Sequence, residues 1–329
     1  MQIKILKPGI LSTIQDLGRM DFLSQAVPTS GAMDTLSARI ANKAVGNPDD
    51  FAVIEFTYAA AELETLTDVL VAYAGDGAIL SINGNNLPSE RPLFIPKGNT
   101  IKLKNNPDGA RTYLSIVGGW AAKTVMGSKS TYLTAGFGGH YGRSLIAGDV
   151  LSNDPITSQL SKTMIKKLKS DTPKFLNWSI PKTLLLSSNR KVIRVFPGRE
   201  FSKFNGLSIT NFFSSTFKIA VNSNRMGFHL EGNLMLQRKK EELLSTAVAP
   251  GTIQVTGSGN LILLMADCQT TGGYPRIAQV AAVDLTLCAQ LKPGDSLQFE
   301  DISTEDAEIL YLEREKELNK LTTAISSRF

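Results

Sequence analysis

Residues 267–276 (DCQTTGGYPR) gather a carboxylate, an amide, hydroxyls and a guanidinium in one short stretch. The apolar run 261–265 (LILLM) leads into it and is typical of a buried strand. Loops that follow such strands on a rigid scaffold often carry function. These groups can bind and polarise an amide or a carboxylate. The alternative is a polar β-turn whose side chains only satisfy one another.

A second polar segment, residues 222–232 (NSNRMGFHLEG), places Arg225 and Glu231 on either side of a Gly-aromatic step. A guanidinium can hold a carboxylate or phosphate through two parallel hydrogen bonds, which makes Arg225 a candidate for binding substrate. A structural salt bridge is the alternative. Gln254 lies on the predicted strand 252–255, which is a candidate hairpin partner for the strand before Asp267.

Two further polar segments adjoin predicted elements. Residues 15–19 (QDLGR) follow a predicted strand, and residues 30–34 (SGAMD) lead into a predicted helix, so Asp34 most simply caps that helix. Residues 127–131 (GSKST) and 136–139 (GFGG) are rich in glycine and hydroxyls. They resemble a phosphate-binding loop in composition but lack the G-x-x-x-x-G-K-[ST] order, and glycine-rich turns explain them equally well.

The sequence contains no Ser-His-Asp order, no H-E-x-x-H motif and no dinucleotide fingerprint. Catalysis would therefore rest on the carboxylates Asp34, Glu55 and Asp267, together with Arg225 and uncharged polar groups. This set includes no strong nucleophile and no obvious ATP site. The chain has two histidines and two cysteines, none with metal-ligand spacing, so we expect no metal site.

The composition is that of an ordinary globular protein, with 329 residues of which 42% are hydrophobic and 20% charged. This length suggests roughly two domains. The net charge of +5 comes from scattered Lys and Arg, and their densest cluster at 162–169 (KTMIKKLK) indicates a solvated basic linker rather than a nucleic-acid site. The sequence has neither a membrane-spanning apolar run nor a signal-peptide pattern. With two isolated cysteines, we expect a cytoplasmic protein without disulfides and without a nucleic-acid or membrane partner.

Most of the chain is predicted as short strands separated by tight turns, which favours β-barrels or sandwiches over alternating βαβ units. The predicted strands are 69–74, 78–82, 100–103, 113–117, 192–196, 216–221, 252–255, 261–265 and 296–299. Helices are expected at 34–45 and at 303–325, where acidic residues near the N-terminus of the second helix suit the helix dipole.

One pattern occurs twice. A strand ending in Gly-Gly-aromatic is followed by Gly-Asp, first through residues 113–120 and 148–149 and then through 261–274 and 294–295. We interpret this as a duplicated β-domain. The expected organisation is a first β-module at 1–152, a polar linker at 153–185, a second β-module at 186–302 and a C-terminal helix at 303–329.

Several motifs occur in an order that resembles the biotin-dependent carboxyltransferase subdomain of urea carboxylase and the KipA family. They are Q-D-x-G-R at 15–19, S-G-A-M-D at 30–34, A-N-x-x-x-G-N at 41–47, G-S-x-S-T at 127–131, G-R-x-L-x-x-G-D at 142–149, S-N-R-M-G-F-x-L-x-G at 223–232, P-G-x-I-Q-V at 250–255 and D-x-Q-T-T-G-G-Y-P-R-I at 267–277. After residue 255 the family often shows a proline-rich P-x-D-G-x-P turn, whereas this chain has TGSGN at 256–260.

The resemblance implies a mainly β fold of two cyclophilin-like β-barrel modules with few short helices and a C-terminal helix. Free-standing bacterial members are read as the C subunit of an ATP-dependent 5-oxoprolinase, which hydrolyses the lactam of 5-oxo-L-proline to L-glutamate. The implied partners are the KipI-like B subunit of 5-oxoprolinase together with its A subunit, so this chain alone would be inactive. ATP would be used by the complex without being clearly bound by this chain. The substrate would be bound by Arg225, Gln254, Gln269, Thr271, Tyr274 and Arg143.

Two alternatives stay open. A KipA-type regulatory protein would bind and antagonise a KipI-like kinase inhibitor. A carboxyltransferase component would act on urea or allophanate-type amides. Biotin is not expected on this chain, because the sequence has neither a Met-Lys-Met attachment site nor a biotin carboxylase domain.

Overall fold

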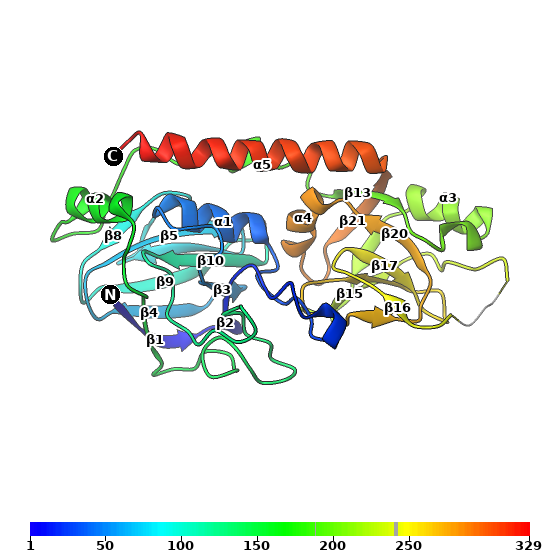
Figure 1. Cartoon of the computed structure of the whole chain (residues 1–329), viewed down its shortest axis with the longest axis horizontal. Helices are drawn as coiled ribbons and strands as arrows, with labels where there is room; N and C mark the ends of the chain where they lie inside the picture. The colour runs from blue at the N-terminus through cyan, green and yellow to red at the C-terminus, as the bar shows by residue number, and fades with distance from the viewer. Residues whose placement is uncertain (188, 240–242) are drawn as a thin grey trace. The chain divides into compact units, whose positions relative to one another are not determined.

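The computed structural model describes residues 1–187, 189–239 and 243–329 (Figure 1). The chain divides into two compact units. The first unit contains Met1–Arg19, Ser30–Leu185 and Lys316–Phe329, and the second contains Met20–Thr29 and Leu186–Glu315. Residues 20–29 thus belong to the second unit although they lie between two segments of the first.

The first unit is made of two antiparallel sheets. Its strands are β1 (Gln2–Pro8), β2 (Leu11–Gln15), β3 (Val53–Thr57), β4 (Ala61–Thr65), β5 (Val69–Gly75), β6 (Ala78–Ile82), β7 (Asn85–Asn86), β8 (Leu93–Ile95), β9 (Thr100–Asn105), β10 (Arg111–Ile116), β11 (Val150–Ser152) and β12 (Lys174–Phe175). They pair into two six-stranded sheets, in the orders β11-β1-β4-β9-β6-β7 and β12-β8-β5-β10-β3-β2.

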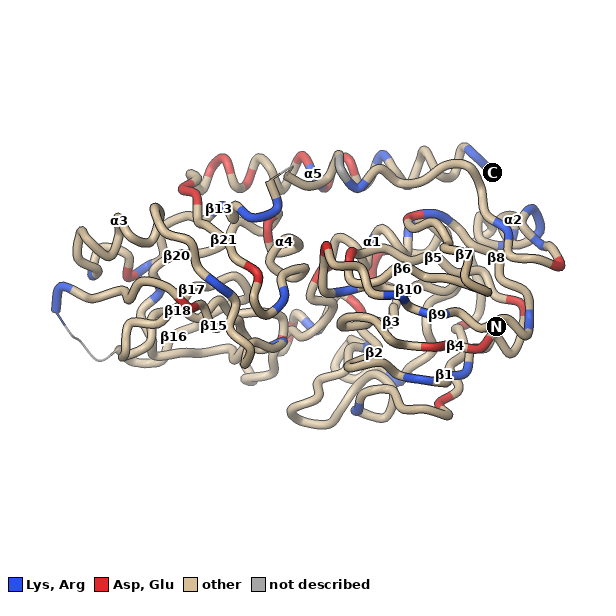
Figure 2. Tube along the Cα trace, turned by 180° about the vertical axis from the view of Figure 1, so that it is seen from behind, with Lys and Arg blue, Asp and Glu red and all other residues tan. Residues whose placement is uncertain are grey.

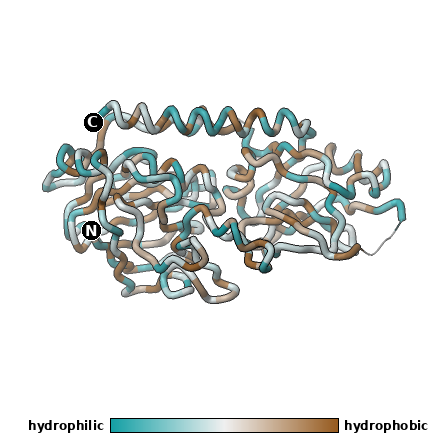
Figure 3. The backbone as a smooth tube through the Cα atoms, viewed as in Figure 1, coloured by the Kyte–Doolittle hydropathy of each residue, from teal (hydrophilic) through white to brown (hydrophobic). Residues whose placement is uncertain are grey.

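Both sheets of the first unit contribute to one apolar core. Ile3 and Leu63 come from one sheet, and Ile54, Val71 and Leu114 come from the other. In β4 and β9 buried and more exposed residues alternate, as expected for strands with one face on the core. Figure 3 shows hydrophobic residues along the strands of both units. The predicted strand 78–82 is confirmed residue for residue as β6.

The helix α1 (Thr35–Ala44) packs on β5 and β10. Asp34 is its N-cap, and the Asp34 side chain accepts a hydrogen bond from the Ser37 amide at 2.9 Å. Gly46, which has a φ of +74°, lies just beyond its C-terminal end. The predicted helix at 34–45 is therefore confirmed, together with the capping role of Asp34.

Residues 153–185, which we expected to be a linker, contribute elements to the first unit. The helix α2 (Gln159–Leu168) begins at the cap Ser158 and buries Met164 and Leu168. The Ser161 hydroxyl donates a hydrogen bond to the Val45 carbonyl at 2.9 Å. The strand β12 pairs with β8. The basic cluster at 162–169 thus lies mostly on α2, whose apolar face packs inward.

The second unit contains a closed barrel. The strands of this unit are β13 (Val192–Pro197), β14 (Phe217–Ile219), β15 (Gly227–Glu231), β16 (Thr246–Ala247), β17 (Thr252–Val255), β18 (Leu261–Leu264), β19 (Thr271–Gly272), β20 (Arg276–Val280) and β21 (Ser296–Asp301). The barrel order is β13-β20-β17-β18-β15-β14-β21, with β13 and β21 running parallel where it closes. The separate strands β16 and β19 pair with each other.

Aromatic side chains fill part of this barrel. Phe212, on the helix α3 (Gly206–Ser214), stacks on Phe299 with ring centroids 4.6 Å apart. Phe217 packs against both rings. A further helix is α4 (Leu285–Ala289), and short 3₁₀ helices lie at Leu23–Gln25, Lys182–Leu184, Phe201–Lys203 and Ala282–Asp284.

The C-terminal helix α5 (Thr304–Ser326) is preceded by Ser303, whose hydroxyl caps it by accepting a hydrogen bond from the Asp306 amide at 3.0 Å. Figure 2 shows acidic residues over its first turns, where the helix dipole favours negative charge. The mainly β fold with a barrel and a C-terminal helix, expected from the sequence, is confirmed. Within the described residues, no helix is long and apolar enough to cross a membrane.

The repeated Gly-Asp dipeptide forms the same turn in both units. Gly148 and Gly294 have φ angles of 95° and 94°. The Asp149 carboxylate accepts from the amide of Ile146 at 2.9 Å, and the Asp295 carboxylate accepts from that of Lys292 at 3.0 Å. Each turn leads into a strand, β11 or β21. The local geometry at this position therefore matches between the two units.

Candidate functional site

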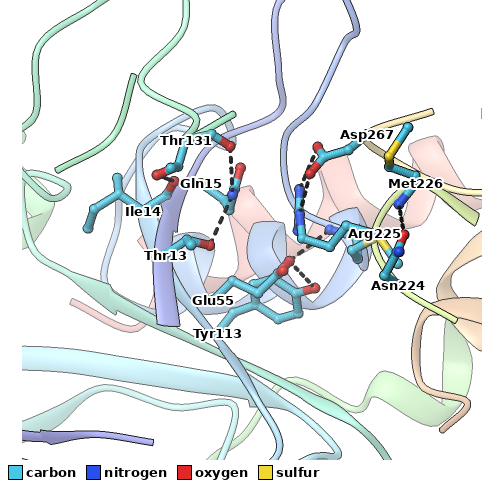
Figure 4. A network of polar contacts seen from close by, with 11 residues as sticks. Thr13, Ile14, Gln15, Glu55, Tyr113, Thr131, Asn224, Arg225, Met226 and Asp267 are labelled. Atoms are coloured by element: carbon cyan, nitrogen blue, oxygen red, sulfur yellow. Dashed lines mark hydrogen bonds and ion pairs between the residues drawn. The ribbon is translucent and has the colours of Figure 1, made fainter. Parts of the chain in front are cut away.

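The polar stretch after β18 begins with a buried ion pair in the second unit. Arg225 donates from Nε to Asp267 Oδ2 at 2.8 Å and from Nη2 to Oδ1 at 3.0 Å (Figure 4). Each of the two side chains is only 6% exposed. The Asp267 amide also donates to the Arg225 carbonyl at 2.9 Å. Because β15 and β18 are neighbours with Gly227 opposite Leu264, the two residues lie side by side just beyond these strands. The pair fixes the start of the polar loop.

The middle of the loop is held by Gln254. This side chain is buried on β17 and donates from Nε2 to the Tyr274 carbonyl at 3.3 Å. β17 is the antiparallel partner of β18, so the predicted hairpin is confirmed. Gly272 lies against the same amide, and a Cβ on it would come within 2.6 Å of Gln254 Nε2. A larger residue at this position would therefore have to displace the Gln254 amide.

The end of the loop is held by a second ion pair, between Arg276 and Glu200. Arg276 donates from Nε and Nη2 to the two Glu200 oxygens, both at 2.8 Å, and from Nη1 to the Ala247 carbonyl at 3.0 Å. The hydrogen bonds from Arg276 hold the pKa of the Glu200 carboxyl below its usual value. Glu200 was missed in the sequence, because nothing near it in the chain marks it as a partner for Arg276.

Three polar side chains of the loop face outward instead. Gln269, Thr271 and Tyr274 are exposed, and their side chains make no hydrogen bond with the residues that the structure describes. A hollow of about 550 Å³ lies beside the loop, and Tyr274 is part of its wall. These outward groups are the ones that can meet a ligand without breaking an internal bond.

The turn 256–260, where the sequence departs from the family pattern, forms another part of that wall. The Thr256 and Ser258 hydroxyls are 2.9 Å apart, and the Asn260 amide donates to Thr256 Oγ1 at 3.1 Å. The hydroxyl and amide side chains thus close the turn on themselves. These hydrogen bonds restrict the turn, which has none of the prolines of the family pattern.

The first unit holds a separate buried network around Glu55. Tyr113, which lies opposite Glu55 on the neighbouring strand, donates its hydroxyl to Glu55 Oε2 at 2.8 Å (Figure 4). The Met33 amide donates to the same oxygen at 2.8 Å, and the Asp34 amide donates to the Tyr113 hydroxyl at 2.7 Å. Burial and the negative charges of Glu55 and Asp34 raise the pKa of Tyr113 well above its usual value. The phenol therefore stays protonated and holds Glu55 in place.

The motif at 15–19 binds the glycine-rich loop of the first unit. Asp16 Oδ1 accepts from the Ser128 and Ser130 hydroxyls, and Asp16 Oδ2 accepts from the Lys129 amide. Arg19 donates from Nη2 to the Ser130 carbonyl at 2.6 Å. Gln15 donates to the Thr131 carbonyl at 3.2 Å (Figure 4). Because the hydroxyls of this loop turn inward to Asp16, they do not form a phosphate-binding cradle.

Arg143 is also held by a carboxylate. It binds both oxygens of Asp149 at 2.8 Å, within the first unit. The Arg143 hydrogen bonds lower the pKa of the Asp149 carboxyl to about 2. In this arrangement Arg143 stabilises the turn before β11.

The comparison with known proteins gives the family. The carboxyltransferase domain family, subdomains A and B, matches residues 25–301. This chain belongs to that family. This carboxyltransferase-domain protein is 35% identical to the C subunit of 5-oxoprolinase from Escherichia coli over 93% of both chains. It is 31% identical to the protein of the same name from Haemophilus influenzae over 99% of both chains.

This carboxyltransferase-domain protein also shares its fold with a solved structure, that of Kluyveromyces lactis urea amidolyase. The TM-score is 0.86 and the sequence identity 29%. The match covers 97% of this chain but 20% of the amidolyase, so the chain spans about a fifth of that enzyme's length.

The predicted site residues of this carboxyltransferase-domain protein form three groups. Asp267 pairs with Arg225 and, with Gln254, holds the polar loop of the second unit from inside. Gln269, Thr271 and Tyr274 face outward from the same loop. Asp34 and Glu55 are neighbours in the first unit, which also contains Arg143. Within the described residues, no cluster of His, Cys, Asp and Glu is suited to hold a metal ion. The functional role of each residue stays a prediction.

Proposed function

We propose that this chain is the C subunit of an ATP-dependent 5-oxoprolinase, which hydrolyses 5-oxo-L-proline to L-glutamate together with an A subunit plus a KipI-like B subunit. The observation that supports this most strongly is the 35% identity to the Escherichia coli 5-oxoprolinase protein over 93% of each chain. The match runs almost from end to end in both proteins. The chain therefore corresponds to nearly the whole length of that protein.

The chemistry of the polar loop fits such a substrate. A lactam is stabilised by amide resonance, so its hydrolysis needs activation of the carbonyl, and transfer of a phosphoryl group from ATP to the lactam oxygen would create a leaving group. We assign the ATP to the assembled complex, because this chain has no recognisable phosphate-binding loop. The contribution of this chain is to bind and orient the substrate.

We assign substrate contact to Gln269, Thr271 and Tyr274. Their amide and hydroxyl groups face outward and have donors and acceptors for a carboxylate and a lactam amide. Arg225, Asp267 and Gln254 act as positioning residues, since their hydrogen bonds run into the loop itself. Internal hydrogen bonds of this kind keep a binding loop in one geometry before the ligand arrives.

The test is reconstitution from separately purified proteins. This chain with the A and B subunits should release glutamate from 5-oxo-L-proline in an ATP-dependent reaction, and this chain alone should release none. Gln269→Ala should lower kcat/KM of the complex by about tenfold, the effect of losing one hydrogen bond to a charged substrate. Gln298→Ala is the matched control, because Gln298 is an exposed amide elsewhere in the second unit that donates to Thr216.

Two outcomes would contradict the proposal. Absence of glutamate above background from the complete mixture would remove the hydrolase function. A tight complex with the KipI-like partner but no turnover would favour the KipA-type regulatory role. Equal effects of Gln269→Ala and Gln298→Ala would leave the hydrolase in place and remove Gln269 from the substrate contacts.

A second candidate is a carboxyltransferase component that acts on urea or a related amide. It is favoured by the TM-score of 0.86 to urea amidolyase. This reaction would need a biotin-carrying protein and a biotin carboxylase from other chains. It predicts carboxylation that requires bicarbonate and is blocked by avidin, whereas glutamate release by the three-protein oxoprolinase should be insensitive to avidin.

A further inference from the structure

The first unit contains a hollow that the proposed function does not use. Its volume is about 510 Å³, and its walls are residues 121–123, Val125, the loop 136–142 and β11. Ligand pockets of proteins typically measure about 300–1,000 Å³. The hollow is therefore large enough for a ring-sized organic molecule.

The glycine-rich wall of this hollow is fixed in place. A Cβ on Gly138 would lie 2.0 Å from the Ser130 carbonyl oxygen, and one on Gly142 would lie 2.0 Å from the Gly136 oxygen. The Asp16 hydrogen bonds to Ser128 and Ser130 anchor the neighbouring part of the loop. A wall packed this closely is preformed, so a ligand does not have to order it.

The lining contains basic side chains but no acidic ones. Lys123 and His140 line the hollow, and the lining includes no Asp or Glu. The Asp149 carboxylate contacts this lining 3.4 Å from His140 Nε2 and is already bound on both oxygens by Arg143. The local charge therefore favours an anion.

The backbone supplies further donors on the same wall. The amides of Gly139 and Gly142 donate to carbonyls of Lys129 and Gly138. The amides of His140 and Tyr141, by contrast, donate to no residue in the described part of the chain. Unused amides in a glycine-rich turn are suitable donors for a carboxylate or phosphate.

Part of the lining is apolar. Val125, Phe137 and Val150 contribute to it, and Phe137 is held in place by the Arg19 guanidinium, whose Cζ lies 4.9 Å from the ring centroid. A ligand that fills the hollow would bury apolar surface on these side chains while its charged group meets Lys123 and His140.

We propose that this hollow binds a small organic anion. A carboxylate or phosphate would contact Lys123, His140 and the loop amides, and a flat apolar body would pack on Val125, Phe137 and Val150. This site belongs to the first unit and is independent of the loop at 267–276, so it goes beyond the proposed oxoprolinase function.

The two histidines of the chain provide the test. His140 lines the hollow, whereas His229 lies on β15 of the second unit and serves as an internal reference. The full chain is titrated with phenyl phosphate, phenylacetate, inorganic phosphate and benzyl alcohol at constant pH while the imidazole proton resonances are recorded. Phenyl phosphate or phenylacetate should shift the His140 signal saturably and leave the His229 signal unchanged. The tighter-binding compound of phenyl phosphate and phenylacetate shows whether the site prefers a phosphate or a carboxylate.

Each half of the proposed ligand has its own control. Inorganic phosphate and benzyl alcohol should each bind at least about tenfold more weakly than the better aromatic anion, because each lacks one of the two contacts. Lys123→Ala should weaken binding several-fold, whereas Lys102→Ala, which removes an exposed lysine of the same unit, should not. Val150→Trp should abolish binding by filling the hollow, since Val150 is an exposed part of its lining.

Three results would overturn the proposal. The first is the absence of a saturable His140 shift at about 10 mM of either aromatic anion, which would mean binding weaker than about 3 kcal/mol. The second is an equal shift of His229. The third is binding of benzyl alcohol as tight as that of the anions.

Discussion

Replacing Arg225 with Met removes the guanidinium that binds both oxygens of Asp267 and leaves that carboxylate buried without this partner. The two hydrogen bonds measure 2.8 and 3.0 Å, and each side chain is 6% exposed. Removing one member of a buried ion pair costs about 3–5 kcal/mol, because the remaining buried charge loses that partner. Arg225→Met should therefore destabilise the second unit by about this amount.

The double variant Arg225→Met/Asp267→Leu separates the charge from the packing. Exchange of a buried ion pair for apolar side chains of similar volume is often nearly neutral in stability. The double variant should therefore be more stable than Arg225→Met alone, and the two single effects should not add. Lys292→Met is the matched control in the same unit, because its partner Asp295 and Lys292 itself are each 32% exposed. A pair this exposed contributes about 1 kcal/mol or less.

Native-state hydrogen exchange followed by mass spectrometry measures both units in one experiment. Peptides from β15 and β18 should exchange roughly a hundredfold to a few thousandfold faster in Arg225→Met, since each 1.4 kcal/mol is about a factor of ten. Peptides from β5 and β10 of the first unit provide the internal reference. A loss of protection below tenfold in β15 and β18, or strictly additive effects in the double variant, would refute the reasoning that the pair is a buried, mutually dependent charge pair.

Three further changes test other parts of the structure. Tyr113→Phe removes the hydroxyl that donates to Glu55 and should destabilise the first unit by about 1–3 kcal/mol. Urea unfolding monitored by tryptophan fluorescence measures this change. An unchanged unfolding midpoint would contradict a stabilising role of the hydrogen bond between Tyr113 and Glu55. The pKa of Asp149 is lowered from its ordinary value of 3.8 to about 2 in the folded state, so the ionised carboxylate adds its full contribution to the free energy of unfolding above about pH 4 and loses it as the pH falls towards 2. Asp149→Asn should therefore reduce the fall in unfolding free energy between pH 4 and pH 2. An unchanged fall would count against this role of Asp149. Burial raises the pKa of the Cys268 thiol to about 12 and raises that of the Cys288 thiol further. A thiol reagent at pH 8 should therefore label neither cysteine in the folded chain and both after denaturation. Rapid labelling of the native protein would be inconsistent with their burial.

The elements set by short-range chemistry were predictable from the sequence. The strands at 78–82 and 252–255 agree with the structure residue for residue, because each is a short run with strand propensity bounded by turn residues. The cap at Asp34 was predictable for the same reason, since a capping side chain bonds to an amide only three residues away.

The helices α2 and α3 were not predicted. α2 lies in a stretch rich in Lys, Ser and Thr that resembles a linker, and only its docking buries Met164 and Leu168. α3 has the sequence GLSITNFFS, in which β-branched and aromatic residues favour a strand. It is helical because Phe212 packs into the barrel beside Phe299. Tertiary packing outweighed local propensity in both cases.

The sequence by itself determined which residues the polar loop contains and which strands flank it. The sequence could not determine which side chains form ion pairs with the charged residues of this loop. Arg225 and Glu231 are close in the sequence, but an extended strand rises about 3.3 Å per residue and therefore separates them by roughly 20 Å. Asp267 is distant in the sequence, yet the pairing of β15 with β18 brings it beside Arg225. Only the tertiary structure decided that pair and the pair of Arg276 with Glu200, because an ion pair depends on distance in space and strand pairing sets that distance.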